Sequence, residues 1–141
     1  MFKKSYWIIF IICTVFTISI FSNQTNVSKH LKNRVAVVKS LLIGINSENY
    51  GLRTSSAYMI GELNITEAVI PLMKMLKSEK NEEARIMAAV SLFKIRDARG
   101  IFAVKQAIRF DTSPRVSRIC EKIYNSYRQQ ESISEVVLAG F

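Results

Sequence analysis

A chain of 141 residues has room for one domain, and a composition of 49% apolar and 22% charged residues argues against disorder over most of its length. The formal net charge of +9 favours acidic partners, namely acidic proteins, anionic lipid headgroups or nucleic acid, and by itself does not choose among them.

The N-terminus resembles an export signal. Lys3 and Lys4 precede an uncharged run whose apolar centre covers residues 6–21, and a basic stretch followed by such a run is typical of secretory signals. The run is shorter than the roughly 20 apolar residues of a membrane span. We therefore expect residues 1–22 to be a cleaved signal peptide or, as the alternative, an N-terminal membrane anchor with membrane contact through residues 6–21. Residues 23–27 would then be a linker to a periplasmic, extracytoplasmic or inner-membrane-anchored bacterial domain.

Apolar residues recur at three- and four-residue steps beyond the linker, which predicts amphipathic helices. The expected helices cover residues 28–45, 52–64, 67–78, 82–96, 98–110 and 114–130. Thr66, Asp97 and Ser113 are expected to cap the helices that follow them, and Pro114 suits a first helical position. Pro71 is expected to mark either the first turn of its helix or a kink, because proline in a helix interior costs about 3 kcal/mol. The partly apolar tail over residues 131–141 either docks on the folded part or stays free.

The central stretch contains one pattern twice. Arg53–Leu76 overlays Arg85–Ile108 without a gap at a shift of 32 residues, so that Ala57 falls on Ala89 and, for example, Leu72 falls on Val104. We expect Leu63 to point inward at the same position as Ile95. A fixed period of 20–50 residues signals a stacked array of repeats. The fold class predicted for residues 28–130 is therefore all-α, as a short α-solenoid of stacked antiparallel helix pairs.

The two copies also carry a family resemblance. Residues 60–69 read IGELNITEAV after Arg53, and residues 85–97 read RIMAAVSLFKIRD. These strings resemble the bacterial HEAT-repeat pattern, also called the phycocyanobilin-lyase-type HEAT-like repeat, over about residues 31–128. The resemblance implies an armadillo-like superhelix and is weak for activity, because such repeats serve many functions. The copies depart from the family pattern at Ile65, Phe93 and Gly100.

In that family a repeated Arg and Asp form a hydrogen-bonded ladder between neighbouring units. The resemblance thus implies a structural role for Arg53, Arg85, Asp97 and Arg115. Arg115 would start a third copy after a two-residue deletion in the preceding loop. The alternative reading of these arginines is a ligand-binding role.

HEAT-like stacks present their second helices on the concave side, and the resemblance therefore also suggests a binding face. Its non-core positions would form a short basic ladder with an aromatic ring beside it: Lys74, Lys77, Phe102, Lys105 and Arg109. We take these five as candidate partner-binding residues. The alternative is that they are ordinary solvated side chains.

Residues for chemistry are few. His30 is the only histidine, and the sequence shows no metal-ligand spacing, phosphate loop or nucleophile elbow. We expect no catalytic residues, no metal and no cofactor, and we expect Cys120 to be a small buried apolar residue. The leading hypothesis is a non-catalytic HEAT-repeat interaction or scaffold module with an acidic protein partner. The alternatives are a phycobilin-lyase-like enzyme or lyase accessory, and nucleic-acid binding through a basic concave face; an export signal argues against both.

Overall fold

The computed structural model describes residues 32–140. Contacts divide the chain into one unit over Met1–Val37 and a second over Val38–Phe141. A helix covers residues 32–44, and only helices and turns occur throughout the described range. The signal or anchor expected at residues 1–22, the linker at 23–27, the start of the first expected helix and His30 lie outside the described residues.

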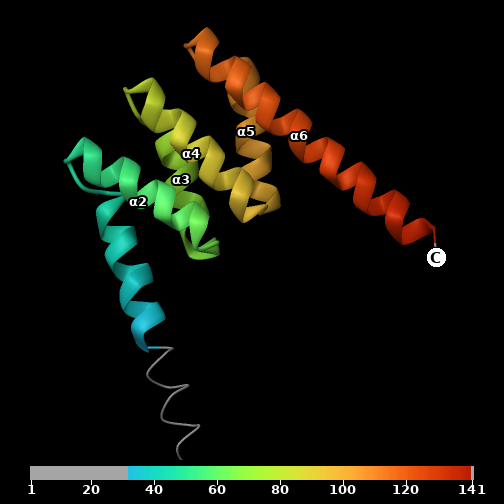
Figure 1. Cartoon of the computed structure of the whole chain (residues 1–141). Coiled ribbons are helices and arrows are strands. Elements are labelled where there is room, and N and C mark those ends of the chain that lie inside the picture. The colour runs from blue at the N-terminus through green and yellow to red at the C-terminus, as the bar shows by residue number, and fades with distance from the viewer. Residues whose placement is uncertain (1–31, 141) are drawn as a thin grey trace, which may run out of the picture. The chain divides into compact units, whose positions relative to one another are not determined.

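The second unit carries the repeat (Figure 1). Its elements are α2 (Tyr50–Glu62), the 3-10 turn η1 (Thr66–Ala68), α3 (Val69–Ser78), α4 (Glu82–Ile95), α5 (Ala98–Phe110) and α6 (Pro114–Ala139). The starts of α2, α4 and α6 follow the 32-residue period, which thus extends to a third copy without a gap. The deletion expected before Arg115 is therefore wrong. Arg115 is equivalent to Glu83, and Ser117 stands where a third copy of the repeated arginine would be.

The helices of this unit form two layers. α2, α4 and α6 lie side by side in one layer, and α3 packs beside α5 in the other. Between the layers, α3 contacts α4, while α5 contacts both α4 and α6. Helices therefore pack in neighbouring pairs along the chain, and the prediction of an all-α, solenoid-like fold is confirmed.

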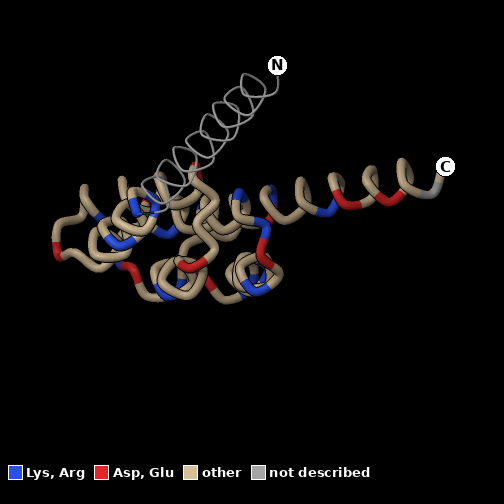
Figure 2. Tube along the Cα trace, turned by 90° about the horizontal axis from the view of Figure 1, so that it is seen from below, with Lys and Arg blue, Asp and Glu red and all other residues tan. Residues whose placement is uncertain are grey.

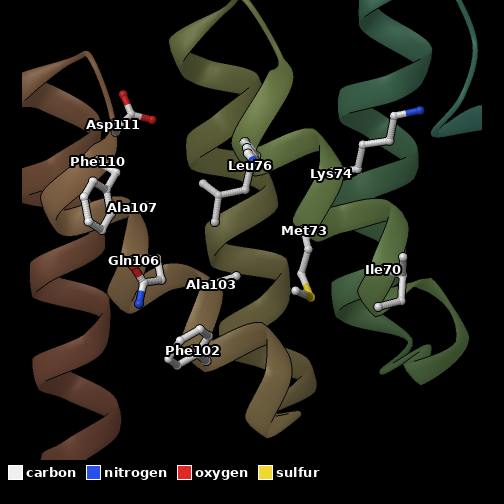
Figure 3. Close-up of a pocket in the computed structure, with 11 residues that line it drawn as sticks. Ile70, Met73, Lys74, Leu76, Phe102, Ala103, Gln106, Ala107, Phe110 and Asp111 are labelled. Atoms are coloured by element: carbon white, nitrogen blue, oxygen red, sulfur yellow. The ribbon is translucent and has the colours of Figure 1, made fainter.

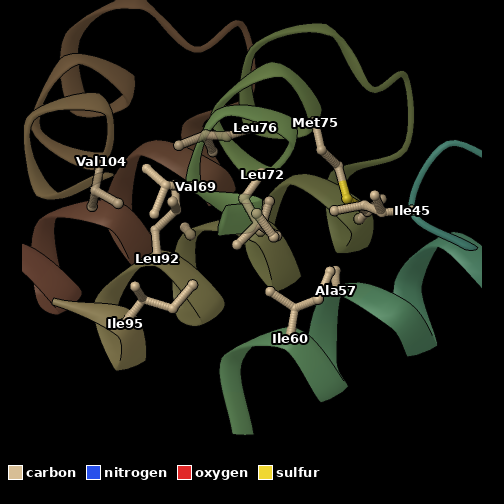
Figure 4. Packing of buried hydrophobic residues seen from close by; sticks show 14 of the residues in the cluster. Ile45, Ala57, Ile60, Val69, Leu72, Met75, Leu76, Leu92, Ile95 and Val104 are labelled. Carbon is tan, nitrogen blue, oxygen red and sulfur yellow. The ribbon is translucent and has the colours of Figure 1, made fainter. Parts of the chain in front are cut away.

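The core between the layers is aliphatic (Figure 4). Its largest fully buried side chains include Ile60, Leu72, Leu92 and Val104. α2 and α4 also touch through their backbones, because a Cβ at Gly61 would lie 2.9 Å from an α4 backbone atom. Burial of this apolar surface, at roughly 25 cal/mol per Å², is the main force that holds the layers together.

The helix ends agree in part with the sequence predictions. Asp97 and Ser113 cap α5 and α6 with their side chains, and Pro114 is the first residue of α6, as predicted. Pro71 lies in the first turn of α3. The prediction of a cap at Thr66 is wrong, because this residue begins η1, whose cap position makes no side-chain hydrogen bond.

Two further predictions need correction. Leu63, expected to point inward, is 47% exposed, because it lies at the C-cap where α2 ends. Residues 131–139, expected to form a separate tail, continue α6. Figure 1 shows this end of α6 projecting past α5. Residue 141 lies outside the described residues.

Candidate protein-binding groove

Arg85 connects successive repeats of the stack. Its Nε and Nη2 donate to the two carboxylate oxygens of Asp111, each at 2.9 Å. Its Nη1 donates to the backbone carbonyls of Glu79 and Lys80 at 2.9 and 3.0 Å. These carbonyls lie in the loop before α4, and Asp111 is the C-cap of α5. The hydrogen bond to Asp111 raises the pKa of Arg85 above its usual value. One buried guanidinium thus ties the loop of one repeat to the end of the next.

Arg53 makes the same contacts one repeat earlier. Its Nε and Nη2 donate to the carboxylate of Glu79 at 2.8 and 3.0 Å. Its Nη1 donates to the carbonyls of Ser47 and Glu48 at 3.0 and 2.7 Å. In both repeats the carboxylate lies 26 residues after its arginine. Arg53 and Arg85 therefore each link the loop before their own helix to the residue that ends the following helix.

The structure does not bring Asp97 or Arg115 into these contacts. Asp97 accepts two hydrogen bonds from the guanidinium of Arg99, both at 2.9 Å, and this lowers its pKa to about 2. Arg115 on α6 pairs with Glu83 on α4, 32 residues earlier. The acids that join the ladder, Glu79 and Asp111, were missed by sequence reasoning. The sequence does contain a signal for them: Glu79 and Asp111 are both acidic and lie one repeat period of 32 residues apart.

A groove of about 640 Å³ lies between α3 and α5. Figure 3 shows the side chains that line it, all from the layer of second helices and the residue that follows α5. Most of the lining is apolar: Ile70 and Met73 come from α3, and Phe102 and Phe110 come from α5. Phe110 is 75% exposed. It was not among the residues selected from the sequence.

The structure separates the five candidate binding residues into two groups. Lys74, Lys77 and Phe102 line the groove. Lys105 does not, because its Nζ lies 5.6 Å from the ring centroid of Tyr124 on α6. Arg109 is four residues further along α5 and therefore shares the side of the helix that carries Lys105. The expected basic ladder is thus divided, and the groove contains two lysines beside an apolar surface.

The described residues offer little for chemistry. Residues 32–140 contain no group of three or more His, Cys, Asp or Glu side chains that could hold a metal ion. Cys120 is fully buried, and burial raises its pKa to about 11, so its thiol is protonated at neutral pH and unsuited to nucleophilic attack. No helix within residues 32–140 is long and apolar enough to cross a membrane.

No protein-family model matches the chain, and a search of curated proteins finds no significant match.

Proposed function

We propose that this protein is a non-catalytic, HEAT-repeat interaction module whose groove between α3 and α5 binds a protein partner. The observation that carries the proposal is the exposure of large apolar side chains in this groove. Ile70, Phe102 and Phe110 are 56%, 58% and 75% exposed, although each is large enough to favour burial. Contiguous exposed apolar surface on a folded protein marks interaction sites, since leaving it in water is unfavourable.

The groove also indicates the chemistry of the partner. An amphipathic helix laid between α3 and α5 would place apolar side chains against Met73 and Phe102. Lys74 and Lys77 on α3 would then meet carboxylates at the edge of the partner's apolar stripe. Opposite charges at such an edge guide the encounter and fix the orientation more than they add affinity. The proposed partner is therefore an acidic segment with one apolar face.

This surface is less suited to nucleic acid. A site that follows a phosphate backbone needs a row of basic side chains, because phosphate contacts supply most of the affinity. The groove supplies Lys74 and Lys77, whereas Lys105 lies against Tyr124 on the side that faces α6. The alternative functions are nucleic-acid binding and phycobilin-lyase-like activity. The proposed location outside the cytoplasm rests on the N-terminal sequence alone.

Photo-crosslinking in cells tests the proposal. The full chain is expressed with p-benzoylphenylalanine in place of Phe102, and in a control in place of Tyr58 on α2, which is 46% exposed and outside the groove. We expect ultraviolet light to give a discrete protein adduct from position 102 and none from position 58. The same adduct from both positions, or none from position 102, would contradict the proposal.

A further inference from the structure

We infer that two copies of this chain pair through the side of α2 that faces away from α4. This side carries a row of exposed apolar residues, here called the α2 edge: Leu52, Met59 and Leu63, which are 50%, 40% and 47% exposed. Their spacing of i, i+7 and i+11 places them on one stripe, since each residue advances a helix by about 100°. Gly61, which touches the α4 backbone, lies on the opposite side of the helix. The α2 edge is separate from the groove between α3 and α5.

The same stripe is buried in the next repeat. One period of 32 residues later, α4 has Ala84, Ser91 and Ile95 at these positions, and they are 0%, 1% and 6% exposed. Ser91 contacts α2 directly, because its Oγ donates to the carbonyl of Ala57 at 2.7 Å. The stripe is therefore the surface on which a helix of this layer receives the helix before it. α2 is the first helix of the layer within residues 32–140, so its stripe is left open (Figure 1).

The sequence before α2 does not supply the missing helix. One period earlier, Thr25 and Ser28 stand at the positions of Ala57 and Ile60, which are both fully buried in α2. Polar residues at two core positions argue against a further helix of this layer. The apolar run over residues 6–21 is the expected signal or anchor, and it would be cleaved off or lie in the membrane. The cover of the α2 edge therefore comes from another chain.

The other end of the layer is closed, which disfavours head-to-tail stacking of copies. The outer side of α6 carries charged residues at the positions that would face a next helix, and Glu121, for example, lies two periods after Ala57. These exposed residues are Arg118, Glu121 and Lys122. Figure 2 shows both basic and acidic positions along α6 towards the C-terminus. A polar outer face is typical of the last repeat of a solenoid, and placing the α2 edge against it would bury charges without partners.

The α2 edge is suited to meet its own copy. α2 contains two charged residues, and both pair within the unit: Arg53 with Glu79, and Glu62 with Lys94. Two α2 edges can therefore meet without bringing like charges together, although each chain has a net charge of +9. Contact between identical surfaces gives a two-fold, isologous interface, the commonest kind in homo-oligomers. About an axis near the middle of the stripe, Leu52 of one copy approaches Leu63 of the other, and the two Met59 side chains lie close to the axis.

Co-purification of two full-length copies with different tags, co-expressed in one cell and released with detergent, tests this pairing. Wild-type copies should co-purify. Met59→Glu in both copies, or Met59→Lys in both, should lower the recovery of the second tag by at least about tenfold, the effect of a modest loss of binding free energy. One copy with Met59→Glu and the other with Met59→Lys should restore the recovery, because opposite charges then meet near the axis.

Tyr58 provides a matched control on the same helix. It is 46% exposed, and its ring centroid lies 5.4 Å from Nζ of Lys94 on α4, so it is not part of the α2 edge. Tyr58→Glu in both copies should leave the recovery near the wild-type level. Wild-type copies that do not co-purify, an equal loss with Tyr58→Glu, or no restoration by opposite charges would overturn the inference. The proposed function of the groove would stand in each case, because it is read from the adduct at position 102.

Discussion

Replacing Arg85 by Met removes the connection between repeats while keeping an unbranched apolar stem. The substitution deletes two hydrogen bonds to Asp111 and two to loop carbonyls. The side chains of Arg85 and Asp111 are only 9% and 6% exposed, so the carboxylate would lose its partner without gaining much water. Breaking a buried ion pair in this way costs about 3–5 kcal/mol. Asp111 still accepts a hydrogen bond from the backbone N–H of Ser113 at 2.8 Å, so we expect a loss of about 3 kcal/mol, at the lower end of this range.

The first repeat provides a matched control. Arg53→Met breaks the same set of contacts, but the side chains of Arg53 and Glu79 are 19% and 14% exposed. Glu79 therefore recovers more hydration, and we expect a smaller loss of about 1–3 kcal/mol. Adding Asp111→Asn to Arg85→Met removes the unpaired charge and retains a side-chain oxygen for Ser113. We expect the double variant to be more stable than Arg85→Met alone.

Urea unfolding of the full chain, followed by far-UV circular dichroism, measures these differences in the free energy of unfolding. We expect the free energy of unfolding to decrease in the order wild type, Arg53→Met, Arg85→Met with Asp111→Asn, and Arg85→Met alone. An Arg85→Met variant that unfolds at the wild-type urea concentration would refute the view that this guanidinium holds successive repeats together. Equal losses at Arg53 and Arg85 would contradict the inferred dependence of the loss on burial of the ion pair.

Three further expectations concern the same unit. Gly61→Ala should lower the free energy of unfolding by about 1–3 kcal/mol in urea titrations, because its Cβ would meet the α4 backbone at 2.9 Å. The control, Gly51→Ala, lies in the less crowded first turn of α2 and should leave the free energy of unfolding unchanged. Equal losses in the two variants would contradict the close packing of α2 on α4. The pKa of Asp97 is lowered to about 2 from 3.8, so its charged form adds stability that is fully present above pH 3.8 and is lost as the pH falls through about 2. The stability difference between wild type and Asp97→Asn, which keeps a capping side chain, should therefore shrink over that interval in urea titrations; growth of the difference towards low pH would reverse the sign. The chain has two cysteines, and Cys13→Ser leaves Cys120 as the one thiol that a reagent can label. At pH 8 Cys120 should react only as fast as the protein unfolds, because the thiol is buried and its pKa is raised to about 11. Rapid labelling of the native protein would contradict this burial.

The period of the sequence predicted much of the fold. A 32-residue shift aligns apolar positions that the structure buries in equivalent places, such as Leu72 and Val104. The starts of α5 and α6 were predictable from local sequence. Asp97 and Ser113 cap these helices through hydrogen bonds to backbone N–H groups only two or three residues away, and Pro114 favours a first helical position. The extension of α6 was missed, although residues 131–139 contain neither Gly nor Pro.

The contacts between repeats were less predictable. The acids paired with Arg53 and Arg85 lie at helix C-caps, where an extended backbone follows α3 and α5. Sequence patterns locate such ends to within a few residues and do not show where a side chain points after them. The groove depends on the rotation of α5 about its axis. Each residue turns the helix by about 100°, so the rotation that places Phe102 in the groove also carries Lys105 towards Tyr124.

The central claim is that the groove between α3 and α5, and not a continuous basic ladder, is the binding surface. The most direct measurement is the yield of the position-102 photo-adduct in two charge-reversed variants of the full chain. Lys74→Glu with Lys77→Glu should reduce the yield sharply, because both side chains line the groove. Lys105→Glu with Arg109→Glu should leave it near the wild-type level. An equal loss in both variants, or a loss only in the second, would contradict the account.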